Sequence, residues 1–507
     1  MAIIVANEIL FLSSQMSHVC FTLCKIIIIG LNLEFSQMLI FPNIVGIDPW
    51  VHRWFTLTIL DNGNIPEGFL YTKLPMMHLM IGITSIVTGL GYKMAMMVSI
   101  SVVQVVCDAL FVFLLGKFLI SAKIGLMAAL LLEVATYHIL FGYWIIPNTL
   151  AATLILPIIF VLFKVRRDKQ FIGTLIALLL MGTLILTHAL TAMCFAILLF
   201  LFWAAFESYN RLFIEETLRP VKIIVSILFS VGMLAYWTYA SGHIMNLANF
   251  IKWDFDKMFL AEYAYLFISS ISFEEKIFTY LGIFLYFAIS FIGCFYVMSK
   301  GFRNSYRFTF MISSVVILII SFLSVITDRY IIQHCWYYLT QIMMSLPLST
   351  SLLLLVGIIK NQLMKRAFIS LSIFCLSFLL IMTPIVNIDN HLFSPNSGIR
   401  FAFTESELHA TNIISNLWNG KISSDWYYQI PFEYEANTEF VNIDSSLYAG
   451  DFTDLQGVII LIREEIIKNP YYTSSGSVKL EYDLYLTLDH QNFSRIYDAG
   501  SISAYVK

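Results

Sequence analysis

One short polar segment of the chain carries the residue types that acid–base chemistry needs. In VGIDPWVHRWFTLTILDNGNIP, residues 45–66, Asp48 and His52 stand four residues apart and Arg53 follows directly. A spacing of four places two side chains on the same face of a helix. A carboxylate so placed could remove a proton, and a nearby cation could stabilise an anion that forms in the same reaction.

A structural role explains part of the same pattern. Asp is preferred at the N-cap of a helix and Pro at its first position, so Asp48 and Pro49 predict a helix over 49–62 that ends at Gly63. The tryptophans of that helix would anchor it in the interfacial layer of a membrane, where tryptophan is enriched. Both roles stay open, because a carboxylate that caps a helix keeps a lone pair for chemistry.

The rest of the chain is far more apolar than this segment. Of its 507 residues, 59% are apolar and 12% are charged, and the mean hydropathy is +0.80. A soluble protein carries about a quarter charged residues. The composition therefore predicts a polytopic α-helical membrane protein that contacts membrane lipids, and the net charge of −3 gives no indication of nucleic-acid binding.

Eleven apolar segments are long enough to cross a hydrocarbon core of about 30 Å as helices. They cover 10–32, 94–116, 122–140, 145–164, 171–187, 189–206, 222–240, 276–299, 308–326, 336–358 and 367–385. A further apolar run at 74–90 is short and contains Pro75 and His78. We interpret this run as a helix that lies along the membrane surface.

The distribution of basic residues predicts the orientation of the chain. If 74–90 does not cross and the N-terminus is cytoplasmic, five cytoplasmic connections hold fifteen Lys and Arg residues, about twice the number in the opposite short loops. The chain then divides into a transmembrane domain, 1–385, with a long first external loop, 33–93, and a small external domain, 386–507. The membrane is expected to be the plasma membrane.

The C-terminal segment has the composition of a small soluble α/β domain. Residues 404–420 predict a helix with a capping box formed by Thr404 and Glu407, and a later segment predicts a hairpin that turns at DAG, residues 498–500. All seven cysteines precede residue 386. An external domain without cysteine needs no disulfides, which fits an archaeal or bacterial cell envelope.

The first external loop resembles that of the GT-C glycosyltransferases. IDPWVHR is similar to the Asp-Pro-Trp element of oligosaccharyltransferase catalytic subunits, and YTKLP is similar to the Lys-Pro element of protein mannosyltransferases and lipid A aminoarabinose transferases. Three later segments resemble outer-turn elements of the same superfamily: WIIPNTLAATLIL (144–156), THALTAMCF (187–195) and TDRYIIQHCWYYL (327–339). The resemblance implies a GT-C-like fold and an enzyme that takes sugar from a polyprenyl-phosphate carrier on the outer membrane face.

This resemblance also implies roles for individual residues. Asp48 corresponds to the acidic residue that acts as general base, or orients the acceptor, in a transfer that inverts the anomeric carbon. Lys73, Arg329 and His334 are candidates for binding the donor phosphate, for which the donor fork of arginine is well suited. Arg329 could instead be a snorkelling residue beside Asp328. Further candidate contacts to donor or acceptor are His52, Arg53, His78, Glu133 and His188.

Several other polar residues allow a structural or a functional interpretation. Asp108 and Glu133 lie within predicted spans, where a central charge costs about 2.5–3.5 kcal/mol, so each should face the interior of the bundle. Glu133 is nearer the outer end, whereas Asp108 and the turn histidine His188 also fit purely structural roles. Asp254 and Asp256 in WDFDKMF are candidate ligands of a divalent metal such as Mg or Mn, although two loop carboxylates are a weak indication.

Two departures from the relatives narrow the prediction. Oligosaccharyltransferase subunits carry a Trp-Trp-Asp-Tyr-Gly element, and the nearest segment here, SSDWYYQIP (423–431), has neither its order nor its glycine. Protein mannosyltransferases have two adjacent acids in the first loop, but here Ile47 precedes Asp48. We therefore predict transfer of a single sugar to a lipid, glycan or protein acceptor. The alternatives are transfer of a lipid-linked glycan to protein, and a transporter or flippase for a lipid-linked sugar.

Overall fold

The computed structural model describes most of the chain. The described residues are 1–12, 15–69, 71–164, 170–213, 221–245, 273–300, 304–326, 330–387, 390, 400–432, 439–469, 471–473 and 476–507. Contacts divide them into two compact units. The first contains the described residues of Met1–Phe35, Gly63–Met258 and Phe278–Val386, and the second contains those of Ser36–Asn62, Phe259–Ile277 and Asn387–Lys507.

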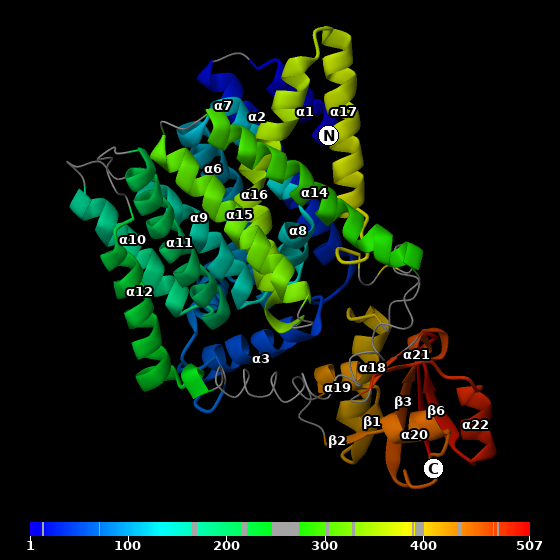
Figure 1. Ribbon diagram of the computed structural model, residues 1–507. Coiled ribbons are helices and arrows are strands. Elements are labelled where there is room, and N and C mark those ends of the chain that lie inside the picture. The colour runs from blue at the N-terminus through cyan, green and yellow to red at the C-terminus, as the bar shows by residue number, and fades with distance from the viewer. Residues whose placement is uncertain are drawn as a thin grey trace. The chain divides into compact units, whose positions relative to one another are not determined.

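The first unit is built from helices packed around an apolar core (Figure 1). Its elements are α1 (Ala2–Leu10), α2 (Met16–Ile40), α4 (Met76–Thr88), α5 (Tyr92–Met96), η1 (Met97–Ser101), α6 (Val102–Leu119), α7 (Ala122–Glu133), α8 (Thr136–Tyr143), α9 (Pro147–Lys164), α10 (Gln170–Ile185), α11 (Ala189–Phe213), α12 (Ile223–Tyr236), η3 (Trp237–Ser241), α14 (Phe273–Lys300), α15 (Ser305–Ile326), α16 (Tyr330–Ile358) and α17 (Gln362–Ile381). Both η1 and η3 are π-helical turns that continue a neighbouring α-helix.

The predicted spans correspond to helices of this unit. Nine helices among the described residues are long and apolar enough to cross a membrane, and α7 with α8 forms a further span bent by 57°. The remaining predicted span corresponds to α10, whose apolar stretch, Phe171–Ile185, is shorter. The run at 74–90 corresponds to α4, whose 13 residues extend about 20 Å at 1.5 Å per residue. The expected polytopic α-helical fold is confirmed.

Glycine allows close approach of α6 and α7. A Cβ built on Gly125 would lie 2.4 Å from the carbonyl oxygen of Phe113, and one built on Gly116 would lie 2.4 Å from the Cα of Gly125. Small residues at such crossings let backbones touch, which is a main source of helix association within membranes.

This contact predicts a matched pair of variants. Gly125→Ala should lower the free energy of unfolding of the detergent-solubilised protein by about 1–3 kcal/mol. The new methyl group would clash with backbone atoms, and no side-chain rotation can relieve that clash. Gly182→Ala in α10 should be neutral or stabilising, since nothing lies within 4 Å of its built Cβ and alanine is the better helix former. Equal stability of the two variants would contradict the packing argument.

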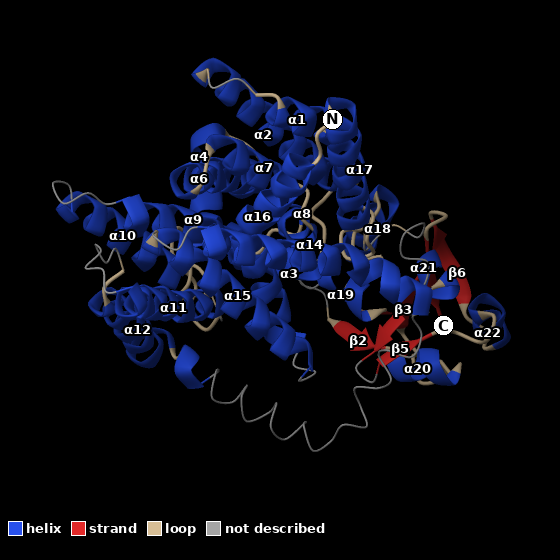
Figure 2. Ribbon diagram, turned by 45° about the horizontal axis from the view of Figure 1, so that its top comes forward, coloured by secondary structure: helices blue, strands red, loops and turns tan. Residues whose placement is uncertain are grey.

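The second unit contains a mixed β-sheet together with helix α3 (Ile47–Asn62). Its other helices are α18 (Glu405–Leu417), α19 (Trp426–Pro431), α20 (Asp444–Ala449), α21 (Glu464–Lys468) and α22 (Leu484–His490), and its strands are β1 (Lys421–Ser424), β2 (Phe440–Asn442), β3 (Val458–Arg463), β4 (Tyr471–Thr473), β5 (Gly476–Val478), β6 (Ser494–Asp498) and β7 (Ile502–Val506). All described strands follow residue 420. Figure 2 draws strands in red.

The five-stranded sheet has the order β2-β1-β3-β7-β6. Strand β1 pairs in parallel with β2 and β3, while β7 pairs antiparallel with β3 and β6. The predicted capping box is present at the start of α18, where Thr404 and Glu407 exchange both bonds. The predicted hairpin is also confirmed, since β6 and β7 are joined through Gly500 with φ +80°. These features show that the C-terminal part is a small α/β fold.

Candidate functional site

Asp48 lies in the first turn of α3. The helix begins at Ile47, two residues before the predicted start at Pro49, so Asp48 is its second residue rather than its N-cap. Its side chain is exposed to solvent, and within the described part of the chain no hydrogen bond or ion pair joins it to another group. Desolvation by the surrounding protein raises the pKa of the Asp48 carboxyl above its usual 3.8. An ionised carboxylate with a raised pKa and open lone pairs is suited to accept a proton.

His52 and Arg53 follow one turn later. His52 is buried, with 3% of its surface exposed, and its spacing from Asp48 places both on one face of α3. The guanidinium carbon of Arg53 lies 5.2 Å from the centre of the Trp50 ring, within the range of a cation–π interaction. Of the two predicted contacts, His52 therefore shares the Asp48 face, while Arg53 packs on a tryptophan of its own helix.

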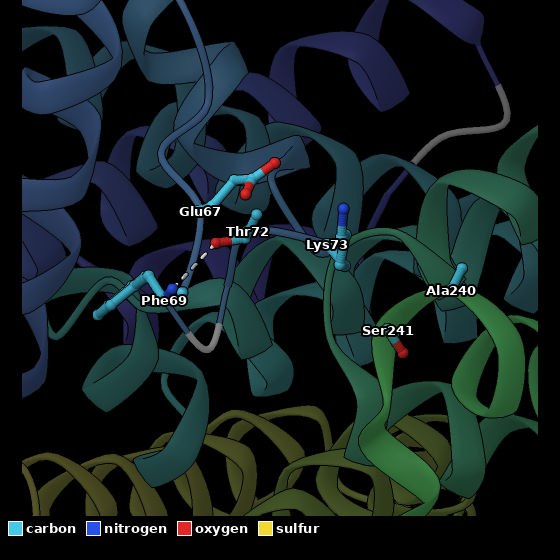
Figure 3. A pocket seen from close by; sticks show the side chains of 7 residues that line it. Glu67, Phe69, Thr72, Lys73, Ala240 and Ser241 are labelled. Carbon is cyan, nitrogen blue, oxygen red and sulfur yellow. Dashed lines mark hydrogen bonds between the residues drawn. The ribbon is translucent and has the colours of Figure 1, made fainter.

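Lys73 lines a pocket of about 600 Å³ in the first unit (Figure 3). The hydroxyl of Thr72 donates to the carbonyl of Pro66 at 2.7 Å, and the hydroxyl of Tyr236 donates to the carbonyl of Lys73 at 2.6 Å. These bonds fix the loop that carries Lys73. Figure 3 shows the Lys73 ammonium and the Glu67 carboxylate pointing in the same direction. The pocket is lined by Glu67, Gly68, Phe69, Thr72, Lys73, Ala240 and Ser241.

The three later segments that resemble outer-turn elements meet around Asn148. The Thr191 hydroxyl donates to Asn148 Oδ1 at 2.5 Å, and the Cys335 thiol donates to the same oxygen at 3.7 Å. His188 Nδ1 lies 2.8 Å from the Thr191 hydroxyl. One side chain from each segment therefore contributes to a single polar cluster in the first unit, although the segments are far apart in the sequence.

Two of the candidate histidines are neutral near pH 7. Burial lowers the pKa of His188 to about 3, and the nearby His334 and His243 lower it further. Burial also lowers the pKa of His78 in α4 to about 3. A neutral imidazole can donate one hydrogen bond but brings no positive charge to a phosphate. The ring centre of His334 lies 5.9 Å from that of Phe141.

Asp108 and Glu133 meet inside the helical bundle, as expected for charges in apolar spans. Both are fully buried and face His138, whose Nε2 lies 3.3 Å from Asp108 Oδ2 and 3.9 Å from Glu133 Oε1. The other ring nitrogen of His138 lies 3.6 Å from Glu34 Oε1. Gly30 leaves the room for this cluster, because a Cβ there would lie 1.9 Å from Glu133 Oε2. Glu133 therefore belongs to an interior network.

Comparison with known proteins gives matches of structure alone. No protein-family model matches the sequence, and no curated protein matches it. The apo oligosaccharyltransferase of Archaeoglobus fulgidus matches with a TM-score of 0.54 at 11% identity, over 87% of this chain and 69% of that chain. ArnT from Cupriavidus metallidurans bound to undecaprenyl phosphate matches with a TM-score of 0.54 at 10% identity, over 96% and 97%. This chain has the same overall fold as these two membrane proteins.

A metal site in this chain stays a prediction. The Archaeoglobus fulgidus enzyme also matches in a structure with Zn and sulfate, with a TM-score of 0.52 at 12% identity over 96% of this chain and 72% of that chain. Among the residues described here, no three His, Cys, Asp or Glu side chains are arranged to hold a metal ion. The predicted ligands Asp254 and Asp256 lie outside the described residues, as does the predicted phosphate ligand Arg329.

Sequence reasoning missed several polar residues of the helical unit and its loops. His138 is an ionisable residue within a predicted span, which is itself a signal that it faces protein rather than lipid. Glu34 was expected in the first loop because the first span was predicted to end at residue 32, but α2 continues to Ile40. Glu67 and Asn148 carried no comparable signal, because single polar residues are common in external turns.

Proposed function

We propose that this protein is a glycosyltransferase that moves a sugar from a polyprenyl-phosphate-linked donor to an acceptor on the outer face of the membrane. The proposal depends above all on Asp48. It is a solvent-accessible carboxylate with a raised pKa and no partner among the described residues, in the first turn of a helix, in a chain with a GT-C fold. A carboxylate with these properties can accept a proton from a bound substrate.

In the proposed reaction Asp48 removes the proton of an acceptor hydroxyl or amide. The acceptor atom then attacks the anomeric carbon from the side opposite the phosphate, and the bond between that carbon and the phosphate oxygen breaks. The anomeric configuration is inverted, the bonding electron pair leaves with polyprenyl phosphate, and the proton remains on Asp48 until it passes to water. Acid–base assistance of this kind contributes about 10²–10⁴-fold to the rate.

Lys73 is the proposed contact to the donor phosphate. The departing phosphate gains negative charge, so an ammonium held near it lowers the barrier. Support comes from the pocket that Lys73 lines, whose volume of about 600 Å³ lies within the usual range of about 300–1,000 Å³ for ligand pockets. Arg329 and His334 are proposed as further contacts on the strength of the family resemblance.

The neighbours support a lipid phosphate donor more directly than any acceptor, because ArnT was solved bound to undecaprenyl phosphate. For the alternative, transfer of a whole glycan to protein, the closest local element is SSDWYYQIP. Its Asp425 is fully buried and forms two hydrogen bonds with Arg463, at 2.7 and 2.9 Å. A carboxylate so engaged is a poor acceptor-recognition group, which favours a single-sugar transferase.

Sugar transfer can be tested directly with the purified full-length protein in lipid. It is incubated with polyprenyl-phosphate sugars labelled in the sugar and with a membrane extract as the source of acceptors. We expect label to move into a new product only when active protein is present. A flippase would instead carry labelled lipid across vesicle leaflets without a new product, and an oligosaccharyltransferase would act only on donors that carry an oligosaccharide.

The proposed orientation places the N-terminus in the cytoplasm and the C-terminal domain outside a plasma membrane. Tyr448→Cys and Leu363→Cys test it, because these side chains are 73% and 75% exposed and lie on opposite proposed sides. An impermeant maleimide added to intact cells should label Tyr448→Cys, and should label Leu363→Cys only after permeabilisation, relative to the parent protein. The reverse pattern would overturn the orientation.

A further inference from the structure

The second unit contains an ion pair with no exposure to solvent. Arg463, the last residue of β3, donates from Nη2 to Asp425 Oδ1 at 2.7 Å and from Nε to Asp425 Oδ2 at 2.9 Å. Both side chains are 0% exposed. The remaining guanidinium nitrogen of Arg463, Nη1, donates to the carbonyl of Arg400 at 3.2 Å. Because burying two charges costs several kcal/mol per ion, such a pair is a weak source of stability and invites another explanation.

The pair is covered by two aromatic rings. The guanidinium carbon of Arg463 lies 5.5 Å from the centre of the Phe403 ring and 5.7 Å from that of Tyr428. The two rings also contact each other, with centres 5.7 Å apart. Asp425 accepts a hydrogen bond from the backbone N–H of Tyr428 at 3.1 Å and so starts α19. Charge and hydrogen bonds thus fix both rings in place.

Phe403 in turn contacts the helix that carries Asp48. The Trp50 ring packs edge-on against Phe403, with centres 5.8 Å apart and planes at 68°. Trp50 is 0% exposed and Phe403 is 2% exposed. Ile47, three residues before Trp50, packs against the core beneath the sheet. Residues three apart share a helix face, so α3 is held by the C-terminal domain along one face.

That attachment determines where the carboxylate of Asp48 points. Successive residues are about 100° apart around a helix, so the two-residue step from Asp48 to Trp50 turns about 200°. Burying Trp50 on Phe403 therefore directs Asp48, and His52 with it, toward the other face of α3. A helix that rotated or slid at this contact would move Asp48 out of register with its substrate.

We infer that Phe403 and the buried pair of Asp425 and Arg463 are positioning residues for the proposed base. They hold Trp50, and through it the first turn of α3, in the orientation that presents Asp48 to the acceptor. This inference rests on the proposed function, because it assigns the residues a role in the step that Asp48 performs. It also explains a charged pair in a domain core that apolar residues could fill.

The test compares two leucine variants of the full-length protein. Phe403→Leu removes the ring that contacts Trp50, while Phe452→Leu removes another buried ring, paired with Phe493 in the same domain core. We expect Phe403→Leu to lower kcat by about 10–100-fold with the KM for donor unchanged, because small misplacements of a reacting group have such costs. It should also move the acidic limb of the rate–pH profile. Phe452→Leu should change neither quantity, even if it lowers the unfolding temperature equally.

A second variant and a second readout keep the test independent of folding and of turnover. Arg463→Lys keeps the charge but loses the planar fork, and it should reproduce the kcat loss. Hydrogen exchange of the amides in 47–56 should rise in Phe403→Leu and stay at the native level in Phe452→Leu.

The possible failures can be told apart. Equal kinetics and equal exchange in the two leucine variants would overturn the positioning role alone. Native transfer by Asp48→Asn would instead remove the base, and with it the function that the positioning serves.

Discussion

Asp48→Asn is expected to lower the rate of sugar transfer by about 10²–10⁴-fold, the usual contribution of a general base. Asparagine has nearly the same shape as aspartate, so donor and acceptor should still bind with KM values close to native. The loss should therefore appear in kcat. The measurement is label transfer from a polyprenyl-phosphate sugar by matched amounts of purified protein.

The same substitution should leave the protein more stable near pH 7. Desolvation by the surrounding protein raises the pKa of Asp48 above its usual 3.8, so the folded protein holds this proton more tightly than the unfolded chain does. Above the folded pKa, the ionised group lowers the free energy of unfolding, and stability returns as the pH falls through that pKa toward 3.8. Asp48→Asn removes this cost. Its unfolding temperature should exceed that of the native protein at pH 7 and converge with it below about pH 3.8.

Asp61→Asn is the matched control, because Asp61 lies near the end of the same helix and is exposed. It should change neither transfer nor stability.

The rate of the native protein should fall on the acidic side at a higher pH than an ordinary Asp would give, since protonation removes the base. Substantial transfer by Asp48→Asn, or a lower unfolding temperature of that variant at pH 7, would contradict the assignment.

Local rules predicted much of the fold. Each apolar run long enough to cross a membrane is a helix or a bent helix pair. Inside a bilayer the backbone N–H and C=O groups can form hydrogen bonds only with each other, and a helix satisfies them all. The capping box of Thr404 and Glu407 and the turn at Gly500 were also predictable, because each depends on only a few adjacent residues. These features need no information from elsewhere in the chain.

Such local rules could not predict that residues 36–62 group with 387–507 in one unit. It depends on contacts such as that of Trp50 with Phe403, which are more than 300 residues apart and have no local signature. The burial of Ser424 and Asp425 was also unforeseen, because a polar SSDW segment is typical of a surface turn. Asp48 is a candidate by residue type, spacing and family resemblance, and its role stays a proposal, but its raised pKa depends on surroundings that only the folded chain provides.

Lys73→Gln is expected to raise the KM for the polyprenyl-phosphate donor by about 10–100-fold. Glutamine keeps a hydrogen-bond donor of similar reach but loses the positive charge, and a hydrogen bond to a charged group contributes about 1.5–3 kcal/mol. If the ammonium also stabilises the departing phosphate, kcat falls as well. Steady-state transfer kinetics at varied donor concentration separate the two effects.

Glu67→Gln supplies the control, because Glu67 lines the same pocket with the opposite charge. If the pocket receives an anion, removing this carboxylate relieves repulsion, so the KM for the donor should stay the same or fall while that of Lys73→Gln rises. General damage to the pocket would raise KM in both variants, and a pocket for a cationic group would reverse the two effects. Opposite changes in the KM of Lys73→Gln and Glu67→Gln would therefore report the sign of the ligand's charge, because the two variants remove opposite charges from the same pocket.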